Sequence, residues 1–282
     1  MFKQSLIAAA VAAAVTSGSV FAADAAPAPS PHTFTANVGL YSQYIFRGLS
    51  QTNGNPAIQG GFDYAYSFGP ASVYVGNWNS NISWLTDGGQ YTSSSLESDI
   101  YAGVKGNFGA SDFTWDAGVL QYLYPGNVNT LANGAKGDTT EVYGAIGWKW
   151  LSAKVSYVVS NKAFAVLDAS GSYYIDLTAA YPVGETGLTL IAHWGDQKFE
   201  GTDYRTAAAG SNDTLYSYSD YKIGASYDLG KVSDVLKSTT FGAYYSNTSS
   251  ANNLGYGGRG EGGVYPKTIS GDQWVVYVQK TF

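Results

Sequence analysis

Apolar and polar residues alternate with a period of two along almost the whole chain, from about residue 33 to residue 282. In segment 58–68 the even-numbered positions are mainly apolar, whereas the odd-numbered positions are polar or small. Successive side chains of a β-strand point to opposite faces, so the pattern predicts strands with one apolar and one polar face. Applied throughout, the rule predicts twelve strands, at 33–48, 56–68, 71–79, 96–108, 112–124, 139–149, 151–160, 171–182, 186–195, 218–229, 238–247 and 272–282.

The connections between these segments differ in length in a regular way. Short turns are expected at 69–70, 109–111, 150–151, 183–185 and 231–237, and they alternate with long polar loops at 49–55, 80–95, 125–138, 161–170, 196–217 and 248–271. A secreted β-sandwich also has alternating strands, but it gives no reason for this order of connections. A membrane barrel does, because short periplasmic turns lie at one end and long extracellular loops at the other.

Composition and aromatic placement point the same way. Charged residues make up 13% of the chain, about half of the ~25% found in ordinary soluble domains. Aromatic residues gather at expected strand ends, as in the girdles of membrane barrels: Tyr66, Phe68, Trp148, Trp150, Tyr181, Trp194, Tyr227, Tyr245 and Trp274. We therefore predict an all-β fold, a single transmembrane antiparallel up-and-down β-barrel over residues 33–282, with short periplasmic turns and long extracellular loops.

The N-terminus has the features of an export signal. Lys3 precedes an apolar run over 6–15, and Val20 and Ala22 stand at the −3 and −1 positions of a cleavage site before Ala23. The run is too short to cross about 30 Å of hydrocarbon, which excludes a membrane anchor. We predict a signal peptide over 1–22, a Pro/Ala-rich periplasmic tail over 23–32, and a location in the cell outer membrane.

The C-terminus and the net charge indicate partners. The chain ends on a strand whose last residue is Phe282, and outer-membrane proteins commonly end on an aromatic residue that the insertion machinery recognises. Lys280 lies on the same face, where a lysine near the interface can still reach water. We expect partners in that machinery, in outer-membrane lipids and lipopolysaccharide, and in small solutes. A formal net charge of −6 argues against nucleic acid, and nothing marks a lipid-free interface, so a monomer is expected.

Two sequence blocks carry a family resemblance. Residues 41–52 read Tyr-Ser-Gln-Tyr-Ile-Phe-Arg-Gly-Leu-Ser-Gln-Thr, and residues 56–64 read Pro-Ala-Ile-Gln-Gly-Gly-Phe-Asp-Tyr. Together they resemble the opening of the TorF-type porin family, long catalogued as hypothetical outer-membrane proteins. Weaker similarity continues through 122–125, 141–148 and the later strands, so it covers essentially the whole mature chain. The resemblance implies a porin-like outer-membrane protein with no catalytic residue and no cofactor.

The width of the barrel and its inward charges predict a function. Twelve strands spaced about 4.8 Å apart and tilted by about 40° leave a lumen roughly 12 Å wide. Small residues on the inward face are expected to keep it open, namely Gly61, Ala65, Gly103, Gly118, Gly224 and Ser226. We expect passive diffusion of ions and small hydrophilic solutes, with selectivity set by inward charges. The candidate pore-lining residues are Arg47, Asp63, Glu97, Asp99, Asp116, Glu141, Asp176 and Lys222, beside Lys105, Lys149, Lys154 and Asp228.

Arg47 is the most informative of these candidates. It is expected near the top of the first strand, facing inward with Asn37, Tyr41 and Gln43 and lying opposite Gln59. It would then either line a constriction of the pore or form hydrogen bonds between strands. For the inward charges as a group, the alternative is that they solvate the lumen or pair across strands.

Two other classes of function, an enzyme and a ligand-binding barrel, are compared with the channel. A barrel phospholipase needs a His beside a Ser nucleophile, but His32 lies in the tail, His193 faces inward, and no Gly-x-Ser-x-Gly motif occurs. We therefore expect no enzyme, no metal and no cofactor. A loop-capped barrel with a ligand-binding or adhesive role and no open pore is the alternative function, because loops 196–217 and 248–271 are long enough to cover the mouth. The loop aspartates match no calcium-binding repeat and are expected to be solvated: Asp87, Asp138, Asp196, Asp203 and Asp213.

Overall fold

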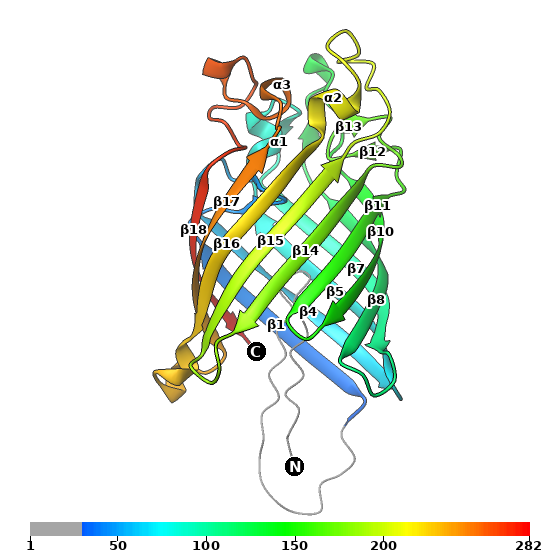
Figure 1. Ribbon diagram of the computed structural model, residues 1–282. Helices are drawn as coiled ribbons and strands as arrows, with labels where there is room; N and C mark the ends of the chain where they lie inside the picture. The colour runs from blue at the N-terminus through cyan, green and yellow to red at the C-terminus, as the bar shows by residue number, and fades with distance from the viewer. Residues whose placement is uncertain (1–29) are drawn as a thin grey trace, which may run out of the picture.

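The structure is a computed structural model that describes residues 30–282 of the 282-residue chain. The expected signal peptide and residues 23–29 of the expected tail lie outside the described residues. Twelve antiparallel strands form one closed barrel, as the alternation predicts (Figure 1). They are β1 (His32–Tyr41), β4 (Ala57–Phe68), β5 (Ala71–Asn81), β7 (Leu96–Asn107), β8 (Phe113–Leu123), β10 (Thr139–Trp148), β11 (Leu151–Val158), β14 (Tyr173–Pro182), β15 (Leu188–Lys198), β16 (Tyr218–Asp228), β17 (Thr239–Ser249) and β18 (Gln273–Thr281).

The barrel is up-and-down and closes between its first and last strands. Each strand pairs with its neighbours in the chain, and β1 pairs with β18, where Tyr41 lies opposite Tyr277. Beyond the end of β18, the backbone N–H of Phe282 donates to the carbonyl of Ala36 over 2.8 Å. Closure leaves no unpaired strand edge, which is the condition for a sheet to lie in lipid.

The outer face of the wall is apolar and the inner face polar. On β4, Ile58 and Phe62 are exposed on the outside, whereas Asp63 points inward and accepts a hydrogen bond from Tyr101. Exposed apolar side chains continue around the wall: Leu40, Val75, Ile100, Val119, Val142, Ile146, Val155, Leu177, Leu190, Ile223 and Val276. A continuous apolar belt of this extent requires an apolar surrounding, as in a transmembrane barrel.

Short and long connections lie at opposite ends of the barrel, as predicted (Figure 1). We call these the short-turn end, where the C-terminus lies, and the long-loop end. Loops at the long-loop end cover 42–56, 82–95, 124–138, 159–172, 199–217 and 250–272. Lys149 lies in the turn between β10 and β11 and pairs with exposed Asp112 over 3.6 Å. Its assignment to the lumen wall is therefore wrong, because the strand ends at Trp148.

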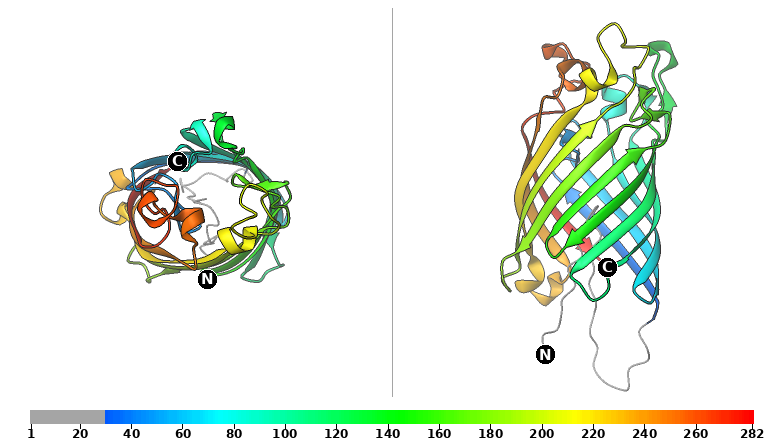
Figure 2. Two further views of the ribbon diagram at one scale, coloured as in Figure 1. Left: turned by 90° about the horizontal axis from the view of Figure 1, so that it is seen from above. Right: turned by 45° about the vertical axis from the view of Figure 1, so that its right-hand side comes forward.

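The long loops carry short elements of their own. These are α1 (Trp84–Asp87), α2 (Asn212–Tyr216), α3 (Asn253–Tyr256), the 3₁₀ turns Thr130–Ala132 and Arg259–Glu261, and two small sheets, β6 (Tyr91–Ser93) with β9 (Asn127–Val128) and β12 (Lys162–Ala163) with β13 (Val166–Leu167). The turn before β17 holds two more 3₁₀ turns, Leu229–Lys231 and Asp234–Leu236. Seen from above, α2 and α3 lie over the mouth of the barrel (Figure 2). Among the described residues, no helix is long and apolar enough to span a membrane.

The expected first strand, 33–48, is wrong at its upper end. β1 ends at Tyr41, and the chain then leaves the wall and folds into the lumen as a small hairpin, β2 (Ile45–Phe46) and β3 (Leu49–Ser50). We call residues 43–52 the inner hairpin. Its strands also alternate, so periodicity alone does not separate them from the wall strand that precedes them. In consequence Gln59 pairs with Gly39 rather than lying opposite Arg47.

Candidate functional site

The tip of the inner hairpin is the two-residue turn Arg47–Gly48. Both residues have positive φ, 46° and 77°, which is the backbone of a tight hairpin turn. A Cβ at Gly48 would lie 2.5 Å from Cβ of Asp220 on β16 and 2.7 Å from Cγ2 of Thr248 on β17. The tip therefore sits directly against the inner wall, and only glycine fits at this position.

Arg47 reaches across the lumen to strands far from β1. Its guanidinium donates to both carboxylate oxygens of Glu141 on β10, over 2.8 and 2.9 Å, and to Oε1 of Gln197 on β15 over 2.8 Å. It also lies 4.4 Å from the ring centre of Tyr174 on β14. The Arg47 and Glu141 side chains are only 6% and 1% exposed. A buried ion pair of this kind depends on both partners, because the loss of either leaves the other charge unpaired.

The rest of the inner hairpin is attached on the other sides of the barrel. Tyr44 donates to Oε1 of Glu97 on β7 over 2.8 Å, and the side-chain amide of Gln43 donates to the carbonyl of Trp274 on β18 over 3.0 Å. The backbone N–H of Ser50 donates to the carbonyl of Ile269 in loop 250–272 over 2.8 Å. The inner hairpin therefore crosses the lumen and is held by strands on every side of it.

The upper part of the lumen, towards the long-loop end, contains an apolar core. Tyr44 and Leu49 of the inner hairpin belong to a cluster of buried residues that also includes Trp84, Leu85, Tyr91, Tyr122, Tyr124, Tyr218, Tyr256, Tyr265 and Ile269. Most of these side chains come from the long loops, and Tyr122 and Tyr218 come from the wall. The loops and the inner hairpin therefore pack together inside the barrel as a small soluble domain would.

The lower part of the lumen, towards the short-turn end, is lined by charged and tyrosine side chains. Asp116 on β8 accepts from Tyr74 over 2.6 Å, and Tyr74 also hydrogen-bonds Tyr143. Lys154 on β11 lies 4.1 Å from the ring centre of Tyr143. Asp116 and Lys154 are partly exposed, unlike Glu141 higher up.

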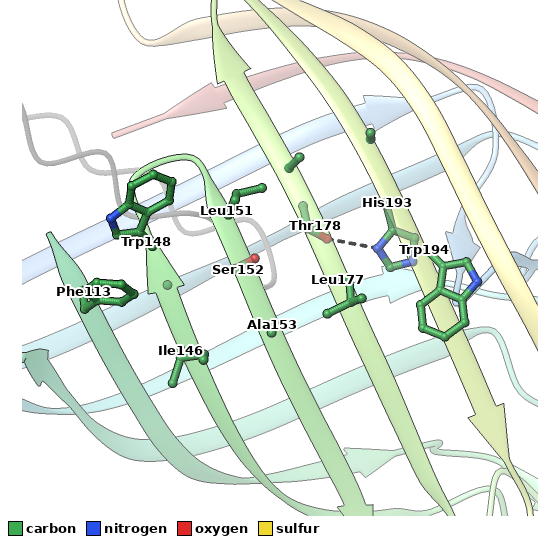
Figure 3. A pocket seen from close by; sticks show the side chains of 13 residues that line it. Phe113, Ile146, Trp148, Leu151, Ser152, Ala153, Leu177, Thr178, His193 and Trp194 are labelled. Carbon is green, nitrogen blue, oxygen red and sulfur yellow. Dashed lines mark hydrogen bonds between the residues drawn. The ribbon is translucent and has the colours of Figure 1, made fainter.

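Further along the same wall, where β11, β14 and β15 are neighbours, His193 on β15 is the centre of a second polar cluster. Its ring nitrogens lie 3.0 Å from Tyr174 Oη, 3.0 Å from Thr178 Oγ1 and 3.1 Å from Asp220 Oδ1, and the Thr178 contact is drawn in Figure 3. Asp176 lies 3.5 Å from Nδ1. None of these partners is a serine, so the cluster does not form a Ser–His pair.

Inward glycines have a different use from the one expected. A Cβ at Gly103 would lie 2.4 Å from Oη of Tyr74, and one at Gly118 would lie 2.6 Å from Oη of Tyr143. The glycines therefore make room for tyrosine rings that lie along the wall of the lower lumen.

A cavity of about 210 Å³ lies between the inner hairpin and the long loops. We call it the vestibule cavity. The inner hairpin contributes Phe46, Leu49 and Gln51 to its lining, and the wall contributes Gln197 and Tyr218. The other lining residues come from four long loops: Trp84, Gly88 and Gln90 from loop 82–95; Phe164, Ala165 and Val166 from loop 159–172; Phe199, Arg205, Thr206 and Tyr216 from loop 199–217; and Leu254, Gly255, Tyr256, Val264, Tyr265 and Ile269 from loop 250–272.

A second hollow, of about 510 Å³, lies on the outer wall (Figure 3). It lies between the outward side chains of Trp148 and Trp194. The outward residues between them, Ala153, Ala179 and Ala192, are small, so the surface of the sheet is recessed there. This hollow faces the apolar surroundings of the barrel rather than the lumen, so it is not a solute site.

An ion pair within loop 199–217 lies beside the vestibule cavity, and its arginine links this loop to two others. Arg205 pairs with Asp203, and its guanidinium also donates to the carbonyls of Ala165 over 2.6 Å and Asn133 over 2.9 Å. We call this group the loop clasp. The expectation that the loop aspartates are solvated is wrong for Asp203, whose side chain is fully buried.

The ion pair also changes the acidity of Asp203. Burial of its carboxylate favours the neutral form, but hydrogen bonds from Arg205 and from the backbone N–H of Leu167 outweigh this effect. The pKa of Asp203 is therefore lowered from its ordinary value.

The structure divides the candidate residues into two groups. Arg47, Glu97, Asp99 and Glu141 are gathered at the inner hairpin, whereas Asp63, Asp116, Asp176 and Lys222 lie on the wall below it. Their role in lining a conducting path stays a prediction.

Several residues of the site escape the sequence reasoning. Tyr44 and Phe46 are taken for wall residues, Gln197 falls within the expected loop 196–217, and Trp84 falls within loop 80–95. Loops that face only water seldom contain many aromatic residues. The aromatic residues of these loops are therefore the sequence signal that indicates packing inside the barrel. Among residues 30–282, no three His, Asp or Glu side chains converge in a way that could hold a metal ion.

An apolar outside, a polar inside and loops gathered at one end define a transmembrane β-barrel with an internal constriction. The chain belongs to the Gcw_chp family, described as a bacterial protein of unknown function, whose model matches residues 25–282. No curated protein matches the chain.

The chain is similar to several solved structures. The KdgM porin is 10% identical, with 88% of this chain and 99% of that chain covered and a TM-score of 0.45. An outer-membrane channel from Pseudomonas putida F1 is 12% identical, with 94% and 100% covered and a TM-score of 0.49. The P. putida toluene transporter TodX is 11% identical, with 90% of each chain covered and a TM-score of 0.46. Such low identities and scores transfer no solute or activity to this chain.

Proposed function

We propose that this protein is an outer-membrane channel for passive diffusion of ions and small hydrophilic solutes, and that the inner hairpin gates it. The single observation that carries the proposal is the change along the lumen. A polar and partly exposed wall in the lower lumen meets one chain segment, residues 43–52, that crosses the lumen under the long loops. Polar lining suits hydrated solutes, and a crossing segment held by side chains suits a gate.

The sequence supports the same assignment. The blocks that resemble TorF-type porins include the whole inner hairpin, and the expected signal peptide and terminal Phe282 fit export and insertion into the outer membrane. We propose that the chain acts as a monomer, in contact with lipid and lipopolysaccharide, and that it has no catalytic activity.

The test is reconstitution of the full mature chain in planar bilayers and in liposomes. We expect small, ion-conducting openings, a reversal potential in asymmetric KCl, and swelling of liposomes in small sugars. A variant in which residues 44–51 are replaced by Asn-Gly should conduct about tenfold more, because the segment that crosses the lumen is then removed. If neither protein conducts, the channel proposal is wrong.

The packed upper lumen favours a second candidate, a loop-capped barrel that binds a ligand and has no open pore. On this alternative the unaltered chain stays silent in bilayers, and the shortened variant alone conducts. The pair of measurements therefore separates a gate that moves from a plug that does not.

A further inference from the structure

The hollow on the outer wall, which we call the outer hollow, is a groove that crosses several strands. It extends from Phe113 and Trp148, at the ends of β8 and β10, across β11 and β14 to Trp194 on β15 (Figure 3). Trp148 is the last residue of β10 at the short-turn end, whereas Trp194 lies in the middle of β15. The outer hollow therefore begins at the edge of the wall and runs obliquely into the apolar belt.

Small side chains form the floor of the outer hollow, and large ones form its ends. Ala179 on β14 pairs in register with Ala192 on β15, and Ala153 lies beside them on β11. The exposed rings of Trp148 and Trp194 stand at either end. A recess of about 510 Å³ lies within the range of sites that hold a small molecule, about 300–1,000 Å³.

The surroundings of the outer hollow indicate what occupies it. It lies within the apolar belt, so the molecules that reach it are lipids. From β10 to β15 it spans three strand spacings, roughly 14 Å, which is comparable with half of the about 30 Å of hydrocarbon in a bilayer. An acyl chain of one leaflet fits this length, and a chain in a recess gains more dispersion contacts than a chain against a flat wall.

Two opposite charges lie where the outer hollow meets the edge of the wall. Asp112 directly precedes Phe113, and Lys149 directly follows Trp148, which pairs in register with Phe113. Nζ of Lys149 lies 4.9 Å from the ring centre of Trp148 and 3.6 Å from Oδ2 of Asp112. Both charged side chains are about half exposed. Such an exposed pair is weak, so other charged groups can approach both partners.

The two charges favour one kind of headgroup. A phosphate group is attracted to the ammonium of Lys149, and an ammonium group is attracted to the carboxylate of Asp112. A headgroup that carries both groups satisfies both side chains. A headgroup with a phosphate and no ammonium leaves Asp112 beside a second negative charge.

We propose that the outer hollow binds one phospholipid whose headgroup carries a phosphate and an ammonium group. An acyl chain lies in the recess, the phosphate lies at Lys149 and the ammonium lies at Asp112. The proposal rests on the outer-membrane location proposed above and does not depend on conduction.

The test is native mass spectrometry of the full mature chain in detergent, titrated with two lipids that have the same acyl chains. Dioleoylphosphatidylethanolamine carries the ammonium group, and dioleoylphosphatidylglycerol does not. We expect the first lipid to bind as one saturable copy and the second to bind about threefold more weakly, as suits exposed charges. Equal binding, or a preference for the second lipid, overturns the headgroup assignment.

Three variants locate the site. Ala179→Trp fills the floor of the outer hollow and should weaken binding of the ethanolamine lipid at least tenfold. Ala102→Trp is the matched control: it adds the same ring between exposed Ile100 and Val104 on the outward face of β7, outside the outer hollow, and should leave binding unchanged. Asp112→Asn should abolish the preference between the two lipids, because the partner of the ammonium group is removed.

A second filling variant, Ala192→Trp, repeats the measurement from the neighbouring strand, in case Ala179→Trp does not fold. Unchanged lipid binding in a folded filling variant overturns the site. A dimer without bound lipid that either filling variant dissociates would assign the outer hollow to a second copy of the chain and would also overturn it. A chain that conducts but does not prefer the ethanolamine lipid overturns only the lipid site, whereas one that binds this lipid but never conducts overturns only the channel.

Discussion

Half-way along the barrel, the inner wall passes from side chains that water reaches to side chains packed as in a soluble core. Asp116 and Lys154 in the lower lumen are partly exposed beside tyrosine rings, whereas Glu141 in the upper lumen is fully buried against Arg47. Both groups come from the same polar face of the same kind of strand. What separates them is the inner hairpin, which packs against Glu141 and does not contact Asp116 or Lys154.

This difference teaches how to interpret charges inside a barrel. An inward charge that faces an open lumen acts through its field on passing ions, and its replacement changes the stability of the fold little. An inward charge packed against a partner is part of the structure, and its loss leaves a buried ion uncompensated. Substitutions in the lower lumen should therefore change ion selectivity, whereas substitutions in the upper lumen should change stability.

The largest effect is expected from Arg47→Ala. It leaves Glu141 buried without its partner and should lower the free energy of unfolding in detergent by about 3–5 kcal/mol, while raising conductance because the tip of the inner hairpin is released. Urea titrations and single-channel recordings measure the two effects. Lys149→Ala, which removes an exposed pair at the short-turn end, should cost no more than about 1 kcal/mol. If Arg47→Ala changes neither the stability nor the conductance, the inner hairpin is not held by this ion pair.

A paired substitution sharpens the same point. Arg47→Met combined with Glu141→Leu removes both charges and should recover most of the stability that either change alone loses. The coupling energy from the four proteins should be about 2 kcal/mol or more. Independent, additive losses would contradict a direct pair between the inner hairpin and the wall.

A smaller effect is expected when acid protonates Asp203 in the loop clasp. Since the pKa of Asp203 is lowered in the folded chain, its contribution to stability is complete above the ordinary value of about 3.9 and is lost only as the pH falls through the lowered pKa. Pepsin cleavage within loop 199–217 should therefore stay slow at pH 4.5 and rise towards pH 2.5, after correction for pepsin activity. Asp203→Asn should be cleaved readily at both pH values. Rapid cleavage of the unaltered chain at pH 4.5 would contradict the ion pair as the tie between the loops.

The smallest effect is expected in the lower lumen. Lys154→Gln should change the ratio of cation to anion permeability by about twofold, because one charge is removed from the partly exposed wall of the lower lumen, and should change stability by less than about 1 kcal/mol. Reversal potentials in asymmetric KCl measure the first and urea titrations the second. A large loss of stability would mean that the lower lumen is packed as the upper lumen is, and the comparison of the two halves would fail.

Much of the architecture follows from the sequence, for a physical reason. Alternation and turn residues are local signals, and lipid imposes the same rule on every strand. The twelve strands are therefore predicted to within a few residues, except for the upper end of the first, and so is the alternation of short and long connections. Strand β4, expected at 56–68, spans Ala57–Phe68. The inner hairpin is missed because its residues 45–50 keep the period of a wall strand, and no local signal tells that they leave the wall.

The candidate site is predicted only in part for a related reason. The sequence places Glu97, Glu141 and Asp176 on the inward face, and the structure has them there. It does not indicate that Arg47 meets Glu141 and Gln197, because those contacts join positions 94 and 150 residues apart. Pairings at such separations depend on how the whole barrel closes, and neighbouring residues carry no information about them.

The long separation of these contacts also bears on assembly. The inner hairpin follows β1, at the start of the barrel, yet Glu141 and Gln197 arrive with β10 and β15. Arg47 can therefore meet Glu141 only when β10, the sixth strand of the wall, is in place, and Gln197 only when β15, the ninth, has been added. The full set of bonds made by this arginine would thus mark a molecule in which at least nine of the twelve strands have been assembled.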